Sequence, residues 1–256
     1  MGATSTPTDH RVIIWAVPRQ HGAWAFLAVP LLVGLALSGW SLIGVWFAIG
    51  WLLAYPASYY LGRAVVVRWR RNSWTRAARR ALQRAAPWAA GAAVIASVLV
   101  LLRPWLLPVG GALAMAWVAS LWLSRHGRER GMANDLLLVS QAALAVPLLV
   151  AVSIDGVPPQ EAWLAGGVVL VFFVGSVLHV KSLIRGSGDR RWALASRGYH
   201  GAALAVGLVS PWLLLPFGTA AVRAFAVPPG TRPAVIGAVE AGVSALVVVG
   251  VALALG

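Results

Sequence analysis

Long apolar runs, each of a length that can cross a membrane, recur along the 256-residue chain and are separated by short polar segments. The segment from Arg63 to Arg84 separates two of these runs and carries eight arginines and no acidic residue. An apolar run of about 20 residues has the length of a transmembrane helix, and short basic segments beside such helices remain in the cytoplasm. The sequence therefore predicts a multi-pass membrane protein whose basic segments lie on the cytoplasmic side.

The composition indicates a body embedded in lipid. Hydrophobic residues make up 60% of the chain and charged residues 11%, against about 25% charged residues in soluble domains. The net charge of +14 would suit nucleic acid, but the basic residues lie in short segments beside apolar runs. We therefore exclude nucleic acid and expect a bilayer with anionic headgroups as the partner. The chain has no cysteine, which excludes disulfides, thiol catalysis and thiolate metal sites.

The predicted fold is all-α, a polytopic transmembrane bundle of about eight helices. The expected helices cover residues 23–37, 42–61, 86–102, 105–123, 134–154, 163–184, 199–217 and 234–255. Residues 218–227 are too short to cross a membrane as one helix, so we expect them at the interface. If this piece did cross, it would be a ninth helix and would move the C-terminus to the outer side.

Around these helices we expect one transmembrane domain at residues 21–256 and a cytoplasmic tail at residues 1–20. The basic cytoplasmic loops are expected at residues 62–85, 124–133 and 185–198. Part of the first loop, from Trp74 to Arg84, has apolar residues at helical spacing and is expected to form an amphipathic surface helix.

The distribution of basic residues sets the orientation. In the eight-helix arrangement the tail holds two, the first two loops hold eight and three, and the last basic segment holds five, which places 18 of 21 on one side. This bias predicts that both termini are cytoplasmic. Twenty of the 21 basic residues are arginine, a bias typical of GC-rich bacterial genomes, so we expect a bacterial inner membrane.

Polar side chains gather at the predicted cytoplasmic ends of the helices. Cations, imidazoles and tyrosines there suit an anion such as a phosphate or a carboxylate. The alternative interpretation is anchoring, because Arg, Lys, Tyr and Trp also hold helices at the headgroup level. The candidates for proton transfer or catalysis are His21, His179 and His200, and those for ligand binding are Arg19, Trp24, Tyr55, Tyr59, Glu129, Arg130, Asn134, Asp135, Lys181 and Arg185.

Other interpretations stay open at several of the polar positions. Asn134 and Asp135 open a helix, where either would cap it. Glu240 lies inside the last helix toward the outer side, as a protonation site or as a neutral packed acid. His179 and His200 lie on consecutive helices, so a haem-binding pair is geometrically possible. No i,i+4 histidine pair or Glu-x-x-His spacing accompanies them, and we expect no metal and no cofactor.

Three segments together resemble the YwiC-like family of bacterial membrane proteins. They are Pro18-Arg19-Gln20-His21-Gly22-Ala23-Trp24, then Glu129-Arg130 with Asn134-Asp135-Leu136, then His179-Val180-Lys181-Ser182-Leu183-Ile184-Arg185 followed by Tyr199-His200. The first segment is the most specific, and the resemblance covers nearly the whole chain. It implies a bacterial membrane protein and no particular activity.

The layout is also similar, more weakly, to the UbiA-type membrane prenyltransferases. That resemblance implies a helical bundle whose cytoplasmic loops after the second and sixth helices face an active site. In that family Asp-rich motifs at both places hold Mg²⁺ and a diphosphate. Here the second helix ends in Tyr55-Pro56-Ala57-Ser58-Tyr59-Tyr60 and the sixth in His179-Val180-Lys181-Ser182. Mg²⁺ needs oxygen ligands, so the metal-dependent chemistry is not expected here.

Three functions remain open on the sequence. The first is a cytoplasmic-side pocket, rich in cations and histidines, for an anionic lipid or isoprenoid-type ligand, with a histidine as the base if a group is transferred. The second is a small-solute or ion transporter, which requires polar residues deep in the helices and a path to the outer side. The third is an assembly factor for a membrane complex, whose protein partners the sequence does not name.

Overall fold

The computed structural model describes residues 17–18 and 21–256, and the regular elements in this part of the chain are all helices, without strands. The helices are α1 (His21–Leu37), α2 (Leu42–Arg71), α3 (Arg76–Leu102), α4 (Leu106–Arg125), α5 (Met132–Ile154), α6 (Gln160–Ile184), α7 (Arg190–Ala203), η1 (Leu204–Leu208), η2 (Pro211–Leu213), α8 (Leu214–Ala226) and α9 (Pro233–Leu255). Six of them, α2 to α6 and α9, are long and apolar enough to cross a membrane. The expectation of an all-α multi-pass membrane protein is therefore confirmed.

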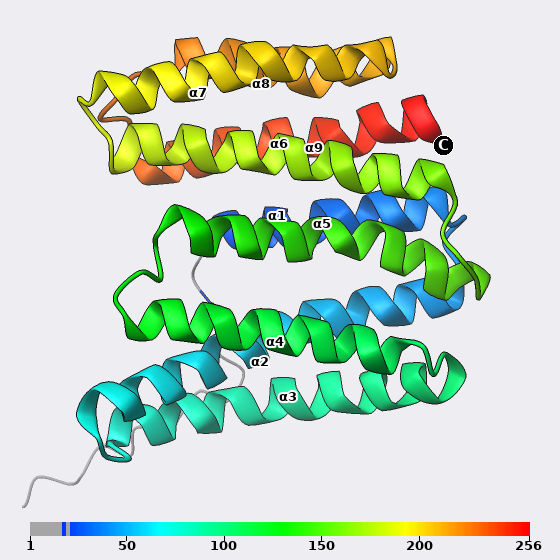
Figure 1. Cartoon of the computed structure of the whole chain (residues 1–256), viewed down its shortest axis with the longest axis vertical. Helices are drawn as coiled ribbons and strands as arrows, with labels where there is room; N and C mark the ends of the chain where they lie inside the picture. Colours follow the sequence, from blue (N-terminus) through cyan, green and yellow to red (C-terminus); the bar gives the residue numbers. More distant parts are fainter. Residues whose placement is uncertain (1–16, 19–20) are drawn as a thin grey trace, which may run out of the picture.

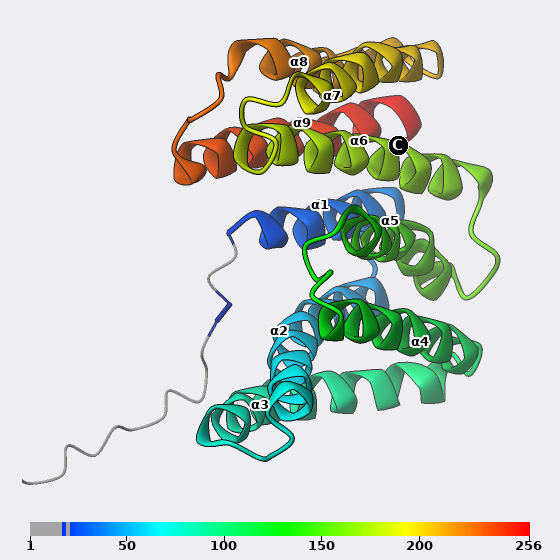
Figure 2. The same ribbon diagram turned by 60° about the vertical axis from the view of Figure 1, so that its left-hand side comes forward.

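The helices run across the long axis of the molecule and follow one another along it (Figure 1). From one end of this axis to the other, α3 is followed by α2 with α4, then α1 with α5, then α6 with α9, and finally α7 with α8 (Figures 1 and 2). One buried cluster joins α1 and α5 to α6, α8 and α9 around Phe172, Phe173 and Phe217. A second cluster joins α1 and α5 to α2 and α3 around Phe47 and Leu149. The central pair α1 and α5 thus belongs to both cores.

Large apolar side chains point outward from α3 and α4. Leu101 is 81% exposed and Met115 is 70% exposed, and both belong to helices of membrane-spanning character. In water such a surface would be unfavourable, whereas hydrocarbon is its natural solvent. The outer faces of α3 and α4 therefore fit contact with lipid.

The basic segments extend the helices, where long loops were expected. α2 continues to Arg71 and α3 begins at Arg76, so only residues 72–75 form the turn within the expected loop 62–85. Thr75 caps α3 by accepting a hydrogen bond from the backbone N–H of Ala78 at 3.2 Å. The surface helix expected from Trp74 to Arg84 is the first part of α3 itself. Arg and Ala have high helix propensity, which lets a helix continue beyond the end of an apolar run.

The two later basic segments are shorter than expected for the same reason. The expected loop 124–133 reduces to residues 126–131, and the expected loop 185–198 reduces to residues 185–189. Together with the turn after α2, these connections lie at one end of the bundle (Figure 1). We call this end, which carries Arg71, Arg76, Arg125, Arg130 and Arg185, the basic end.

The single helix expected at residues 199–217 is wrong. Ser210 has extended backbone angles, φ −162° and ψ 138°, and there the chain reverses between η1 and η2. The residue before a proline is driven out of the helical region, and Pro211 follows Ser210 directly. α7 and α8 consequently form a hairpin that packs on α6 and α9 (Figures 1 and 2).

With this hairpin the described residues form nine α-helices, because α8 takes the place of the short interfacial piece expected at residues 218–227. Helix directions alternate through the chain, so α9 ends at the opposite end of the bundle from the start of α1 (Figure 1). The eight-helix expectation, with both ends of the helical part on one side, differs from the structure. Glu240, expected toward the outer side, lies two turns inside α9 on its basic-end half.

Candidate functional site

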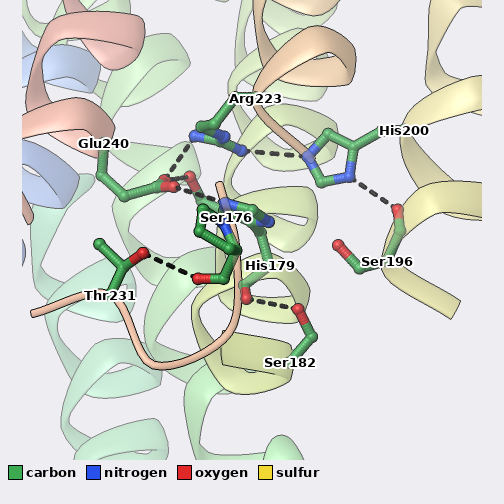
Figure 3. A network of polar contacts seen from close by, with 9 residues as sticks. Ser176, His179, Ser182, Ser196, His200, Arg223, Thr231 and Glu240 are labelled. Atoms are coloured by element: carbon green, nitrogen blue, oxygen red, sulfur yellow. Dashed lines mark hydrogen bonds and ion pairs between the residues drawn. The ribbon is translucent and has the colours of Figure 1, made fainter. Parts of the chain in front are cut away.

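A cluster of buried polar side chains joins four helices near the basic end (Figure 3). Its members come from the last half of α6, from α7, from the end of α8 and from the first half of α9. Each of them is no more than 8% exposed. The cluster consists of Ser176, His179, Ser196, His200, Arg223 and Glu240.

An ion pair lies at the centre of the cluster. Arg223 Nη1 is 2.7 Å from Glu240 Oε2, and Ser176 Oγ donates a hydrogen bond to the same carboxylate oxygen (Figure 3). Arg223 is 3% and Glu240 8% exposed. Burying charges is costly unless they are paired and hydrogen-bonded, and ionisable groups within membrane helices usually serve a function. The pair is therefore the first sign of a site in this half of the molecule.

His200 extends the ion pair into α7. Its Nε2 lies 3.0 Å from Arg223 Nη2, and its Nδ1 lies 2.7 Å from the backbone oxygen of Ser196. A guanidinium only donates hydrogen bonds and a carbonyl only accepts them. The network thus assigns the neutral tautomer with the proton on Nδ1, and Nε2 accepts from Arg223. His200 positions the guanidinium, and its lone pair is already used.

His179 lies against the same cluster but is less tightly held. Its ring is 6.0 Å from that of His200 between centroids, and its Nε2 is 3.9 Å from Glu240 Oε1, which is longer than a hydrogen bond. The side chain is 1% exposed, and neither ring nitrogen has a hydrogen-bond partner among the described residues. The candidate histidines His179 and His200 thus lie side by side in the cluster. Within the described part of the chain no three His, Asp or Glu side chains are arranged to hold a metal ion.

A pocket of ≈ 370 Å³ lies between α1, α6 and α9 and shares two residues with the cluster. Ser176 and Glu240 line it together with Ser244, and Lys181, Arg185 and Asp135 line its part nearer the basic end. The remaining wall is apolar and comprises Ala25, Phe26, Phe173, Val177, Val180, Ile184, Pro233, Ile236 and Gly237. The volume is within the range of ordinary small-molecule pockets, about 300–1,000 Å³. The pocket thus joins the sequence-predicted cations to a buried carboxylate.

At the mouth of the pocket, the start of α5 and the loop before it contact the side chains of Lys181 and Arg185. Lys181 Nζ lies 2.5 Å from Asp135 Oδ2 and donates to the backbone oxygen of Arg130 at 2.8 Å. Arg185 donates to the same oxygen. Asn134 donates to the backbone oxygen of Glu129 at 2.8 Å, and the residue at the cap of α5 is Gly131. The capping interpretation of Asn134 and Asp135 is therefore wrong, because these side chains hold the preceding loop and Lys181.

The charges around the pocket do not cancel. Lys181 is paired with Asp135, and Arg223 is paired with Glu240. Arg185 is exposed, and among the described residues its guanidinium contacts a backbone oxygen and no carboxylate within ion-pair distance. One cation therefore remains uncompensated at the mouth of a largely apolar pocket.

The other sequence-predicted candidates lie elsewhere. Trp24 of α1 and Tyr55 of α2 pack edge to face with centroids 5.2 Å apart, and the ring of Tyr59 lies tilted beside that of Tyr55 at 6.4 Å. All three lie outside the pocket lining. Glu129 forms an exposed ion pair with Arg70 at 3.5 Å. The structure does not bring these residues to the pocket. Arg19 and the side chain of His21 lie outside the described residues.

Arg223 was missed by sequence reasoning, and Glu240 was given no partner. The sequence did contain a signal, because Glu240 is the only acid after Asp189 and stands within an apolar helix. Such an acid requires a cation, and Arg223 is the one cation inside the preceding apolar piece. The hairpin between α7 and α8, which brings the two together, was not predicted.

Comparison with known proteins places the chain in a family. The model of the YwiC-like protein family matches residues 17–149, about half of the chain. A protein of Bacillus subtilis (strain 168), described as the uncharacterized protein YwiC, is 28% identical over 206 residues, which covers 78% of this chain and 75% of that protein. No solved structure matches the chain.

Proposed function

The chain belongs to the YwiC-like family, and we propose that it binds an amphipathic anion in the pocket between α1, α6 and α9. An anionic lipid or an isoprenoid-type molecule fits this description. Arg185 would contact the anionic head, and the apolar wall would contact the chain. Magnesium has no Asp-rich pair of motifs to hold it here, so the head is bound by cationic side chains alone.

The observation that carries the proposal is the uncompensated guanidinium of Arg185 beside a largely apolar pocket. An anion at this position would gain a charge-assisted hydrogen bond without breaking an existing ion pair. Lys181 lies beside Arg185 and donates to the same backbone oxygen, and its ammonium is also paired with Asp135.

The extent of the pocket favours binding over transport. Its lining residues come from the start of α1, the last half of α6 and the first half of α9, which all lie toward the basic end. A transporter needs access from both sides of the membrane. We propose, from the excess of basic residues, that this end faces the cytoplasm of a bacterial cell and that the ligand enters from that leaflet.

Native mass spectrometry of the detergent-purified protein, with extraction and identification of bound lipid, tests the proposal. We expect one anionic amphiphile per chain. Arg185→Ala should lower its occupancy about tenfold, the effect of losing one charge-assisted hydrogen bond. Arg190→Ala is the matched control, because it removes the same charge from an exposed site outside the pocket lining.

An empty protein, or bulk phospholipid whose occupancy is the same in the Arg185→Ala variant, would contradict the proposal. The transport and assembly interpretations would then take its place. Flux of a labelled solute through proteoliposomes would support the first of them, and co-purification of a membrane complex would support the second.

A further inference from the structure

Glu240 lines the pocket, and one oxygen of its carboxylate has no hydrogen-bond donor within the described part of the chain. One carboxylate oxygen, Oε2, contacts both Arg223 and Ser176, whereas Oε1 has no hydrogen-bond partner among the described residues. His179 Nε2 lies 3.9 Å from Oε1, beyond hydrogen-bond reach. Glu240 is 8% exposed and lines the pocket. A buried acceptor without a donor is costly, and a ligand that supplied the donor would relieve this cost.

The two polar parts of the pocket are separated by a defined span of helix. Ser176, beside Glu240, precedes Lys181 by five residues and Arg185 by nine on α6. At 1.5 Å of rise per residue this corresponds to about 8 to about 14 Å along the helix axis. Val177, Val180 and Ile184 line the pocket within that span. A molecule that filled the pocket would therefore meet a cation, then an apolar wall, then a carboxylate.

We infer that the ligand carries, besides its anionic head, a hydrogen-bond-donating group such as a hydroxyl at the far end of a short apolar chain, and that Glu240 selects it. The inference rests on the proposed function, because it places the head of the ligand at Arg185. It goes further in naming the chemistry of the other end. A second anionic group is excluded there, since it would meet the Glu240 carboxylate.

The test is a competition in native mass spectrometry between 10-hydroxydecanoate and decanoate, which differ only by the terminal hydroxyl. The wild-type protein is expected to hold the hydroxylated probe at least about tenfold more than the plain one after correction for their detergent partition, as for one hydrogen bond to a charged acceptor. The double variant Arg223→Met/Glu240→Leu removes both buried charges together and should lose the preference. Gly242→Leu is the control, since this residue is exposed and outside the pocket lining.

A second variant, Glu240→Gln, keeps the size of the side chain and takes the place of the double variant if that one does not fold. It should reduce the preference for the hydroxylated probe. Equal occupancy by both probes in the wild-type protein would overturn the inference and leave the proposed function intact. Absence of both probes from the wild-type protein would instead contradict the proposed function. A preference for the hydroxylated probe that persists in both Glu240 variants would also overturn the role of this residue.

Discussion

At the scale of single residues, the pairing of Arg223 with Glu240 is the feature that distinguishes this chain from a plain apolar bundle. Both side chains are buried, and their charges compensate each other at 2.7 Å. Ser176 and His200 supply further hydrogen bonds to the pair. A buried pair adds little net stability compared with apolar packing, but removal of one partner leaves an isolated charge. Stability should therefore respond very differently to single and double substitutions.

We predict that Arg223→Met lowers the free energy of unfolding by about 3–5 kcal/mol, because it leaves the Glu240 carboxylate unpaired. Arg223→Met/Glu240→Leu should recover most of this loss. Thermal unfolding followed by the fluorescence of the 14 tryptophans measures both variants. A double variant as unstable as the single variant would show that the charges themselves do not determine the effect.

The sequence predicted part of this site. The positions of Lys181, Arg185 and Asp135 at helix ends indicated an anion site, and the structure brings these three to one pocket. Their charges and spacing on apolar helices are local information. The partner of Glu240 could not be predicted, because Arg223 reaches it only through a chain reversal 13 residues earlier at Ser210. Trp24 and Tyr55 are aromatic residues of the kind that bind ligands, yet they contact each other between α1 and α2 and do not line the pocket.

At the scale of elements, hydropathy locates the apolar runs well and the helix ends poorly. The apolar run in α2 ends near residue 61, but the helix continues to Arg71, and four of these last ten residues are arginine, which has a high helix propensity. The opposite error occurs at residues 199–217, where an apolar run contains a reversal. Pro211 was a local signal of that break, because a proline drives the residue before it, here Ser210, out of the helical region.

Close contact between α8 and α9 gives the hairpin a specific test. A Cβ atom built on Gly250 lies 3.0 Å from Pro216 Cδ and 3.1 Å from the backbone oxygen of Trp212, neither of which moves easily. Gly250→Ala should therefore lower the free energy of unfolding by about 1–3 kcal/mol through overpacking. Gly242→Ala, in the same helix with open space around its Cβ, should be neutral or slightly stabilising. Equal effects of the two substitutions in tryptophan-fluorescence melting would contradict this packing of α8.

At the scale of the whole molecule, the sequence predicted an all-helical multi-pass protein of eight or nine helices, and the described residues form nine α-helices. The choice between eight and nine helices depends on α8, which has only 13 residues. A helix of this length is too short to be recognised by apolar length alone. Its position follows from packing against α9 and α7, which is not local information.

The absence of cysteine from the chain permits a direct test of this topology. Single cysteines at Ser73 and Ser187 should react with an impermeant maleimide from the same side of the membrane, because both positions lie at the basic end. Cysteines at Gly156 and Gly256 should react from the other side. All four positions are exposed in the structure. Labelling of Ser73→Cys and Gly256→Cys from one side would contradict the arrangement of α8 and α9.

Binding of a ligand in the pocket is most directly tested by a substitution whose larger side chain fills the pocket. Gly237 lines the pocket and has open space around its Cβ, so Gly237→Leu should fold and occupy the space of the ligand. Gly242→Leu makes the same substitution one and a half turns later on α9, outside the pocket lining. We expect native mass spectrometry to find the co-purified anionic amphiphile on the wild-type protein and on Gly242→Leu, and to find it lost from Gly237→Leu. Retention of the amphiphile by a folded Gly237→Leu protein would show that it binds elsewhere.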